Sequence, residues 1–209
     1  MKKYKAVLFD FDGTLMDSSE GILASAKYTA TQMGIPIAED APWNSFIGPA
    51  LEDCFRIVLD VKEDRIEEAV EIYRKVYKEN GQFRAHFYPG VIDTLKELVN
   101  RKYILGIATF KASSVAVEMG NYYGLGRYFK DIFGKTSSPD DTKGKIIQRA
   151  IDKLGVPKND IVMVGDSPLD SEGAKNAGID FIGVSYGFGD MSGEKGIMLD
   201  NFSDLIYCI

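Results

Sequence analysis

Four short runs of consecutive apolar residues constrain the fold of this 209-residue chain more than any other feature. The runs fall within residues 5–10, 103–108, 161–164 and 181–184. Such runs are typical of parallel strands that are covered by helices on both faces. Helical patterns lie around and between the later runs, at residues 91–101, 113–123, 144–154 and 168–177. The alternation predicts an α/β fold with a doubly wound parallel sheet.

Residues 17–86 depart from this alternation and carry helical patterns only. We expect one helix from Ser18 to Met33, before the breaker residues 34–36, and a second over residues 49–59. The third pattern places six residues on one helix face: Ile66, Ala69, Val70, Tyr73, Val76 and Tyr77. The sequence therefore predicts a core domain of residues 1–16 and 87–209, with a small helical domain of residues 17–86 inserted after the first strand.

Composition and charge narrow the class of protein. The chain is 45% hydrophobic and 27% charged and has a formal net charge of −6, which argues against a nucleic-acid polymer or an anionic membrane as partner. The apolar run after Lys5 is too short for a secretion signal, and no run is long enough to cross a bilayer. Two distant cysteines, Cys54 and Cys208, favour a reducing compartment. We expect a cytoplasmic protein, and the sequence leaves open whether it is a monomer or a homodimer.

Polar side chains follow three of the predicted strands at the point where each strand ends. Asp10 and Asp12 follow the first, Thr109 follows the second, and Asp166 follows the third. The carboxyl ends of parallel strands meet at one edge of a sheet, and ligands bind in the crevice there. We therefore expect these side chains to face a single site.

The segment Asp10-Phe11-Asp12-Gly13-Thr14 carries the most specific signal. Two carboxylates this close together at the end of a buried strand disfavour each other's ionisation unless a cation neutralises them. Gly13 allows a sharp turn and a close approach of the backbone to a ligand. A surface turn with helix-capping aspartates is the alternative, but the apolar strand before and Gly13-Thr14 after argue against it.

These residues resemble the motifs of the haloacid-dehalogenase superfamily. Its first motif, Asp-x-Asp-x-Thr, fits residues 10–14, and its second, a Ser or Thr after the next core strand, fits Thr109. Its third is a lysine near the start of a later helix, for which Lys143 is favoured and Lys145 competes. Its fourth, Gly-Asp-x-x-x-Asp, fits residues 165–170. The motifs occur in the family's order, and the insertion resembles its helical cap.

The resemblance implies a Mg²⁺-dependent phosphatase acting on a small phosphorylated metabolite. By analogy, Asp10 attacks phosphorus to form an aspartyl-phosphate, and Asp12 is the general acid and base. The expected metal ligands are the Asp10 carboxylate, the Asp12 main-chain carbonyl and Asp166. Asp170 is expected to support them or to hold a metal-bound water.

The same resemblance implies a set of residues that bind the phosphoryl group. Thr109 is expected to donate to a phosphoryl oxygen, and Lys143 to neutralise charge on the phosphate and the nucleophile. Backbone N–H groups of the first motif, through Gly13 and Thr14, complete the cradle. Lys111 is expected to support phosphate binding rather than to act in catalysis.

Substrate choice is expected to depend on the inserted domain. The loop 43–49, which includes Gly48, and the nearby Cys54 and Arg56 form the expected specificity region. The Ile-Gly-x-x-Leu pattern in this region is similar to that of phosphoglycolate phosphatases and some nucleotidase-like relatives. Phe110 departs from the family pattern, since many relatives carry a small or amide residue there. Gly187-Phe188-Gly189 lacks the glycine spacing of a nucleotide loop and is predicted to be a turn.

Several other functions fit part of the pattern. A β-phosphoglucomutase-type phosphotransferase shares every catalytic residue and differs in its cap contacts. A true dehalogenase needs no magnesium, and Asp12 and the pair Asp166 and Asp170 argue against it. A response-regulator receiver carries its phosphorylated aspartate after a middle strand rather than the first. A catalytically silent phosphate-binding protein is the remaining alternative, and the sequence does not select the substrate.

Overall fold

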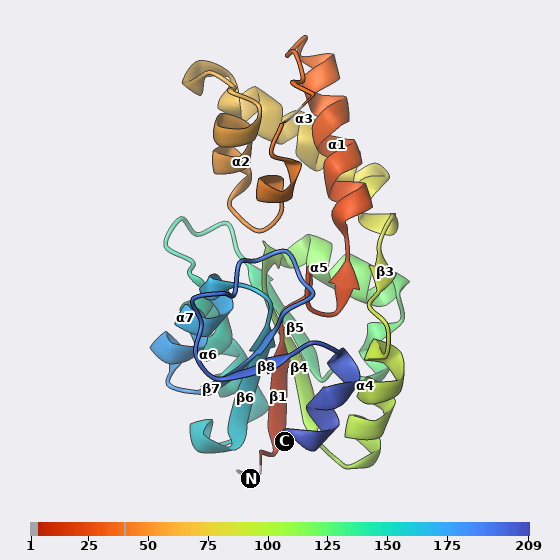
Figure 1. The fold of residues 1–209 in the computed structure, drawn as a ribbon, viewed down its shortest axis with the longest axis vertical. Helices are drawn as coiled ribbons and strands as arrows, with labels where there is room; N and C mark the ends of the chain where they lie inside the picture. The colour runs from red at the N-terminus through yellow and green to blue at the C-terminus, as the bar shows by residue number, and fades with distance from the viewer. Residues whose placement is uncertain (1–3, 40) are drawn as a thin grey trace. The chain divides into compact units, whose positions relative to one another are not determined.

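The computed structural model describes residues 4–39 and 41–209. Residues 1–3, at the start of the predicted core domain, and residue 40, within the predicted helical domain, lie outside the described residues. The chain divides into two compact units (Figure 1). The larger unit combines the segment that ends at Asp17 with Phe87–Ile209, and the smaller unit is Ser18–His86.

The larger unit is built on a six-stranded parallel sheet with the strand order β5-β4-β1-β6-β7-β8. The strands are β1 Ala6–Phe9, β4 Ile104–Ala112, β5 Asp131–Lys135, β6 Ile161–Gly165, β7 Asp180–Val184 and β8 Ile197–Leu199. The helices of this unit are α4 Val91–Asn100, α5 Ser113–Tyr122, α6 Lys143–Leu154 and α7 Pro168–Ala177. This architecture confirms the predicted α/β fold with a doubly wound parallel sheet.

Strand β1 lies at the point where the winding direction of the sheet changes. The chain runs from β1 to β4 and β5 on one side, and then to β6, β7 and β8 on the other. Phe9 is in register with Ile107 of β4 and with Val164 of β6. Because all three strands are parallel, the residues that follow them leave the sheet at the same edge. Ligand sites in such sheets lie at this switch point, outside the carboxyl ends of the strands.

Both faces of β1 are covered, which explains its consecutive apolar residues. Ala6 and Leu8 belong to a buried cluster with residues of α6 and α7, two helices that lie together on one side of the sheet (Figure 1). The ring of Phe9 lies 5.8 Å from that of Phe129 and 5.7 Å from that of Phe202. Since successive side chains of a strand point to opposite faces, a strand covered on both sides must be apolar at every position.

Four strands were not predicted from the sequence: β5 is interrupted by Asp131, Gly134 and Lys135, and the other three have only two or three residues each. β5 and β8 are the edge strands of the sheet, and most of their residues remain partly exposed. Two further strands of two residues each, β2 (Met16–Asp17) and β3 (His86–Phe87), pair with each other. Strands this short, or this exposed, give no long apolar run that could be recognised in the sequence.

The regular secondary structure of the smaller unit's described residues is helical, apart from its last residue, His86, which belongs to β3. It contains α1 (Ser19–Gln32), α2 (Leu51–Val58) and α3 (Ile66–Glu79), with short 3₁₀ turns between and after them. Its core includes four aromatic side chains in mutual contact: Phe46, Phe55, Tyr73 and Tyr77. The two tyrosines are therefore core residues, as the helical pattern predicted. No helix among the described parts of the chain is long and apolar enough to cross a membrane.

Helix α1 approaches the backbone after α3 so closely that a side chain does not fit at Gly21. A Cβ atom added there would overlap the carbonyl oxygen of Gly81. A Cβ at Gly81 would in turn lie 2.5 Å from Ser25 Oγ and 2.6 Å from the ring of Tyr77. Backbone packing between α1 and this turn therefore depends on both glycines.

We expect Gly21→Ala to destabilise the smaller unit by about 1–3 kcal/mol, because overpacking forces the backbones of α1 and Gly81 apart. Urea unfolding followed by fluorescence measures this, since the single tryptophan of the chain, Trp43, lies in the smaller unit. Thr31→Ala, at an exposed position of the same helix, is the matched control and should change the free energy of unfolding by no more than about 0.5 kcal/mol. Equal stability of the two variants would contradict the packing argument.

Candidate active site

Asp10 lies one residue beyond β1, at the carboxyl edge of the sheet. Its backbone N–H still donates to the carbonyl oxygen of Val164, at 2.9 Å, so the residue continues the register of the strand. Its carboxylate is buried, and Lys143 Nζ donates to Asp10 Oδ1 at 2.6 Å. Lys143 is the first residue of α6 and is itself buried, whereas Lys145 is exposed.

Three buried carboxylates meet at this edge. Asp10, Asp166 and Asp170 each offer an oxygen, and these oxygens lie within 4.8 Å of one another. Lys143 Nζ also lies 2.6 Å from Asp170 Oδ1, so one ammonium is shared between two of the carboxylates. With all four groups ionised, the cluster retains an excess of two negative charges.

The excess charge changes the protonation equilibria of the cluster. Burial raises the pKa of Asp10 to about 7; Lys143 opposes this shift, while Asp170 and Asp166 add to it. Burial raises the pKa of Asp166 to about 6, and the charge of Asp170 adds to the shift. Burial acts to lower the pKa of Lys143, but Asp10 and Asp170 together outweigh it and raise that pKa above its usual value. The site therefore disfavours its own carboxylate charges until more positive charge is supplied.

Three buried carboxylates form a donor set that fits a divalent cation, and Asp170 is the one that also caps a helix. Its Oδ2 accepts the N–H and the hydroxyl of Ser167, at 3.1 and 2.7 Å, and so caps α7. Its Oδ1 is buried and forms an ion pair with Lys143 Nζ at 2.6 Å. Oxygen donors are the ligands that Mg²⁺ prefers. Asp10, Asp166 and Asp170 therefore form a suitable donor set.

The side chain of Asp12 lies outside this cluster and has its own cation. Lys111 Nζ donates to Asp12 Oδ2 at 2.8 Å and to Oδ1 at 3.1 Å. The Lys111 side chain is 8% exposed and that of Asp12 is 19% exposed. The lysine expected to support phosphate binding is therefore in direct contact with the second aspartate of the motif.

Thr109 lies in β4, where the pairing with β5 becomes irregular between Ala108 and Ala112. It is buried, and its Oγ1 accepts the backbone N–H of Lys111 at 3.2 Å. A hydroxyl that accepts one hydrogen bond keeps its proton for a further acceptor. The residue can therefore still donate to a ligand oxygen.

Phe110, the departure from the family pattern, contributes to packing. Its side chain lies against the buried cluster formed by β1, β6, α6 and α7. Lys135 Nζ lies 4.4 Å from the centroid of its ring. The aromatic ring thus fills space in the larger unit and is covered by a cation.

The first motif and a distant loop converge on Asp166. Thr14 Oγ1 donates to Asp166 Oδ1 at 3.0 Å, and the backbone N–H groups of Phe188 and Gly189 donate to Asp166 Oδ2 at 2.8 and 3.3 Å. A Cβ at Gly13, whose φ is +83°, would overlap the Asp166 carboxylate. From the sequence, residues 187–189 were predicted to be a turn only. The signal that could have been used is the pair of glycines following a strand that ends at the same sheet edge.

Two predicted binding residues, Gly48 and Arg56, belong to the smaller unit. Gly48 is exposed and has a φ of +111°. The guanidinium of Arg56 is exposed and donates to Asp53 at 2.6 Å and to Glu63 at 3.0 Å. These contacts raise the pKa of Arg56, through Glu63 first, and place the cation between two carboxylates of its own unit.

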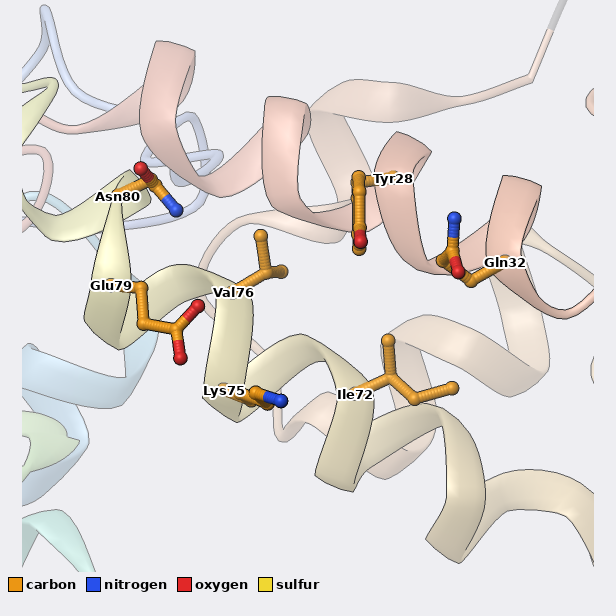
Figure 2. Close-up of a pocket in the computed structure, with 7 residues that line it drawn as sticks. All are labelled: Tyr28, Gln32, Ile72, Lys75, Val76, Glu79 and Asn80. Carbon is orange, nitrogen blue, oxygen red and sulfur yellow. The ribbon is translucent and has the colours of Figure 1, made fainter.

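A hollow of about 350 Å³ between α1 and α3 does not share the chemistry of the cluster (Figure 2). It is lined by Tyr28, Gln32, Ile72, Lys75, Val76, Glu79 and Asn80. None of the predicted site residues lines it. The candidate active site is therefore the carboxylate cluster at the end of β1.

The loop before Lys143 is anchored by Asp141, whose side chain is 2% exposed. Its carboxylate accepts two hydrogen bonds from Arg149, at 2.7 and 3.0 Å, and the N–H and hydroxyl of Thr136 at 2.8 and 2.9 Å. Arg149 also donates to the carbonyl oxygen of Gly134 at 3.0 Å. This network ties the end of β5 to the start of α6, and so positions the residue that pairs with Asp10.

Comparison with known families identifies the architecture. The family model of haloacid dehalogenase-like hydrolases matches residues 7–184, which span most of the chain and all four motifs. The chain belongs to the haloacid dehalogenase-like hydrolase family. This membership confirms the family predicted from the motifs and argues against the receiver-module alternative.

Individual relatives agree with this assignment over nearly the whole chain. A 5'-nucleotidase from Pseudomonas aeruginosa is 35% identical over 188 residues, which cover 90% of this chain and 85% of the relative. A phosphoglycolate phosphatase from Vibrio parahaemolyticus is 30% identical, with 88% of this chain and 85% of that protein covered. The solved structure of a haloacid dehalogenase-like hydrolase from Streptococcus pneumoniae superposes with a TM-score of 0.89 at 32% identity, covering 100% of both chains.

The Asp141 network predicts a pH-dependent contribution to stability. Arg149 above all, with Thr136, lowers the pKa of Asp141 to about 2 in the folded protein. This lies below the unfolded value of about 3.9, so the stabilisation is fully present above about pH 4 and is lost as the pH falls towards 2. We expect Asp141→Asn to be less stable than wild type by about 1–2 kcal/mol at pH 7, and this difference to shrink between about pH 4 and pH 2.

Urea unfolding at a series of pH values measures the difference. Asp140→Asn, at the exposed neighbouring position, is the matched control and should follow wild type throughout. A difference for Asp141→Asn that stays constant from pH 7 to pH 2 would show that ionisation of Asp141 is not its source.

Proposed function

We propose that this protein is a Mg²⁺-dependent phosphatase that hydrolyses a small phosphomonoester through an aspartyl-phosphate on Asp10. The observation that carries the proposal is the buried cluster of three carboxylates that share one lysine. A phosphate monoester is an anion and repels nucleophiles, so its site must supply positive charge before it can supply attack. A cluster that favours a divalent cation meets this requirement.

The proposed metal ligands are Asp10, the main-chain carbonyl of Asp12, Asp166 and Asp170, the last directly or through water. When bound, Mg²⁺ supplies the positive charge that attracts and orients the phosphoryl oxygens. The buried carboxylates of Asp10, Asp166 and Asp170, whose oxygens lie within 4.8 Å of one another, support this donor set.

In the first chemical step, a carboxylate oxygen of Asp10 attacks phosphorus while the bond to the leaving oxygen breaks. Asp12 gives its proton to that leaving oxygen, so the product departs as an alcohol. Lys143, already paired with Asp10, offsets the negative charge around phosphorus, and the free hydroxyl proton of Thr109 is available for a phosphoryl oxygen.

In the second step, water attacks the phosphorus of the aspartyl-phosphate. Asp12, now ionised, takes a proton from this water, the bond between Asp10 and phosphorus breaks, and inorganic phosphate leaves. Each proton that Asp12 gives in the first step is thus regained in the second. Lys111 Nζ contacts the Asp12 carboxylate and so holds this side chain in place.

The substrate is proposed to be a phosphoglycolate, nucleotide or sugar phosphate. Relatives named 5'-nucleotidase and phosphoglycolate phosphatase support this range. We propose that the smaller unit acts as the cap domain that selects among them, through the loop 43–49 with Gly48, and through Arg56. A phosphoglucomutase-type activity remains the second candidate, because it would use the same catalytic residues.

We expect the purified protein to hydrolyse p-nitrophenyl phosphate only when Mg²⁺ is present, and Asp10→Asn to reduce turnover by a factor of at least about 10³, because the nucleophile is lost. Release of inorganic phosphate measures the rate. Asp93→Asn, at an exposed position of α4, is the matched control and should retain full activity. Turnover that persists in excess chelator would be incompatible with the proposal.

The same assay defines the substrate when it is run with phosphoglycolate, nucleoside monophosphates and sugar phosphates. With a hexose 1-phosphate, release of inorganic phosphate identifies a phosphatase, whereas formation of the 6-phosphate isomer identifies a mutase.

Substituting Lys143 and Lys145 separately tests which of the two is the lysine of the third motif. We expect Lys143→Met to lower kcat by about 10²–10³, because removing a cation from the reacting centre leaves the developing charge without its partner. Lys145→Met, two residues away on the exposed side of α6, should stay close to wild type. Steady-state kinetics at saturating Mg²⁺ measures both, and similar losses in the two variants would contradict the assignment.

A further inference from the structure

Gly187-Phe188-Gly189 was predicted from the sequence to be a turn. In the structure, its backbone also donates two hydrogen bonds to the Asp166 carboxylate. We propose that this segment is a clamp that positions Asp166 and restricts it to binding metal through Oδ1 alone. The inference rests on the proposed function, in which Asp166 is a metal ligand, and assigns a role in that site to the loop between β7 and β8.

The hydrogen bonds to the two oxygens of Asp166 are unequal. Oδ2 accepts the backbone N–H groups of Phe188 and Gly189, at 2.8 and 3.3 Å. Oδ1 accepts only the hydroxyl of Thr14, at 3.0 Å, among the bonds described. Each carboxylate oxygen has two lone pairs. Oδ2 is therefore fully engaged by the clamp, and Oδ1 keeps one lone pair for a cation.

The clamp requires glycine because of space rather than backbone conformation. A Cβ atom at Gly187 would overlap Asp166 and would lie 2.5 Å from the carbonyl oxygen of Gly13. A Cβ at Gly189 would overlap the carbonyl oxygen of Asp166 and lie 2.7 Å from Ser167 Cα. Neither Gly187 nor Gly189 has a positive φ. Any side chain at these positions would push the loop away and lengthen its hydrogen bonds to Asp166.

Tyr186 anchors the clamp to the first motif. Its hydroxyl donates to the carbonyl oxygen of Thr14 at 3.0 Å, and its ring lies 4.6 Å from that of Tyr88, measured between centroids. Thr14 is thus bonded at its carbonyl by the loop and at its hydroxyl by Asp166. Three segments that are far apart in sequence, around residues 14, 166 and 187, hold one another in place.

A clamp of this kind acts on metal affinity more than on the chemical steps. Hydrogen bonds to a metal-binding carboxylate fix its orientation, and their loss weakens metal binding by about 10–100-fold in known metal sites. When Mg²⁺ is saturating, Asp10, Asp12 and Lys143 still surround the phosphoryl group. Loss of the clamp should therefore raise the Mg²⁺ concentration needed for half-maximal activity far more than it lowers kcat.

The test compares Mg²⁺ binding by wild type, Gly187→Ala and Gly193→Ala in the full chain. Isothermal titration with Mg²⁺ gives Kd directly, and the rise of Tm with added Mg²⁺ gives an independent value. We expect Gly187→Ala to bind at least about tenfold more weakly. Gly193→Ala lies in the same loop, where an added Cβ meets no atom within 4 Å, and should bind as wild type does. Tm without metal reports whether each variant is folded.

A second variant removes the hydrogen bond without adding any side-chain volume. Replacing residue 188 by the α-hydroxy acid with the phenylalanine side chain converts its N–H into an ester oxygen, which cannot donate to Asp166. We expect this protein to show the same weaker Mg²⁺ binding, and it decides the matter if Gly187→Ala does not fold.

Asp166→Asn is the positive control, in which Mg²⁺ binding should be lost or severely reduced. If wild type binds Mg²⁺ and hydrolyses phosphate esters while the clamp variants bind it equally well, the clamp is refuted and the proposed function stands. If wild type itself binds no Mg²⁺, the proposed function and the clamp both fail.

Discussion

Repulsion between buried carboxylates is the constraint on which the rest of this structure depends. Asp10, Asp166 and Asp170 lie within 4.8 Å of one another, in a part of the fold where burial alone disfavours their charged forms. Lys143 offsets part of this repulsion by pairing with two of them. A protein that only needed to be stable would place apolar residues here, since buried ionic clusters contribute little net stability. The arrangement makes sense as a receptor for additional positive charge.

The fold brings these charges together by rigid, local means. β1 lies between β4 and β6 at the switch point of the sheet, so the loops after three parallel strands leave it side by side. α6 begins at Lys143 and α7 is capped by Asp170, so each helix contributes to the cluster from its first turn. The network around Asp141 then fixes the loop that leads to α6. The charged groups of the cluster thus lie at the ends of strands and in the first turns of helices that pack against the sheet.

The sequence was sufficient to predict the strands and the motif that are recognisable from neighbouring residues alone. Strands covered on both faces must be apolar at every position, which is why β1, β4, β6 and β7 were visible as runs and why their order implied a doubly wound sheet. The motif Asp10–Thr14 was recognisable because its residues are adjacent in the chain. The edge strands β5 and β8 were missed, because polar residues and a glycine interrupt β5 and because β8 has only three residues.

By itself, the sequence determined the fold class, the family and the residue types of the carboxylate cluster, since each depends on contiguous or regularly spaced residues. Only the tertiary structure decided which groups are partners. It paired Lys143 rather than Lys145 with Asp10, placed Lys111 against Asp12, and brought Phe188 and Gly189 to Asp166. These pairings join segments separated by 22 to 133 residues. No local pattern records such contacts, because they follow from how strands and helices pack rather than from what lies next to them in the chain.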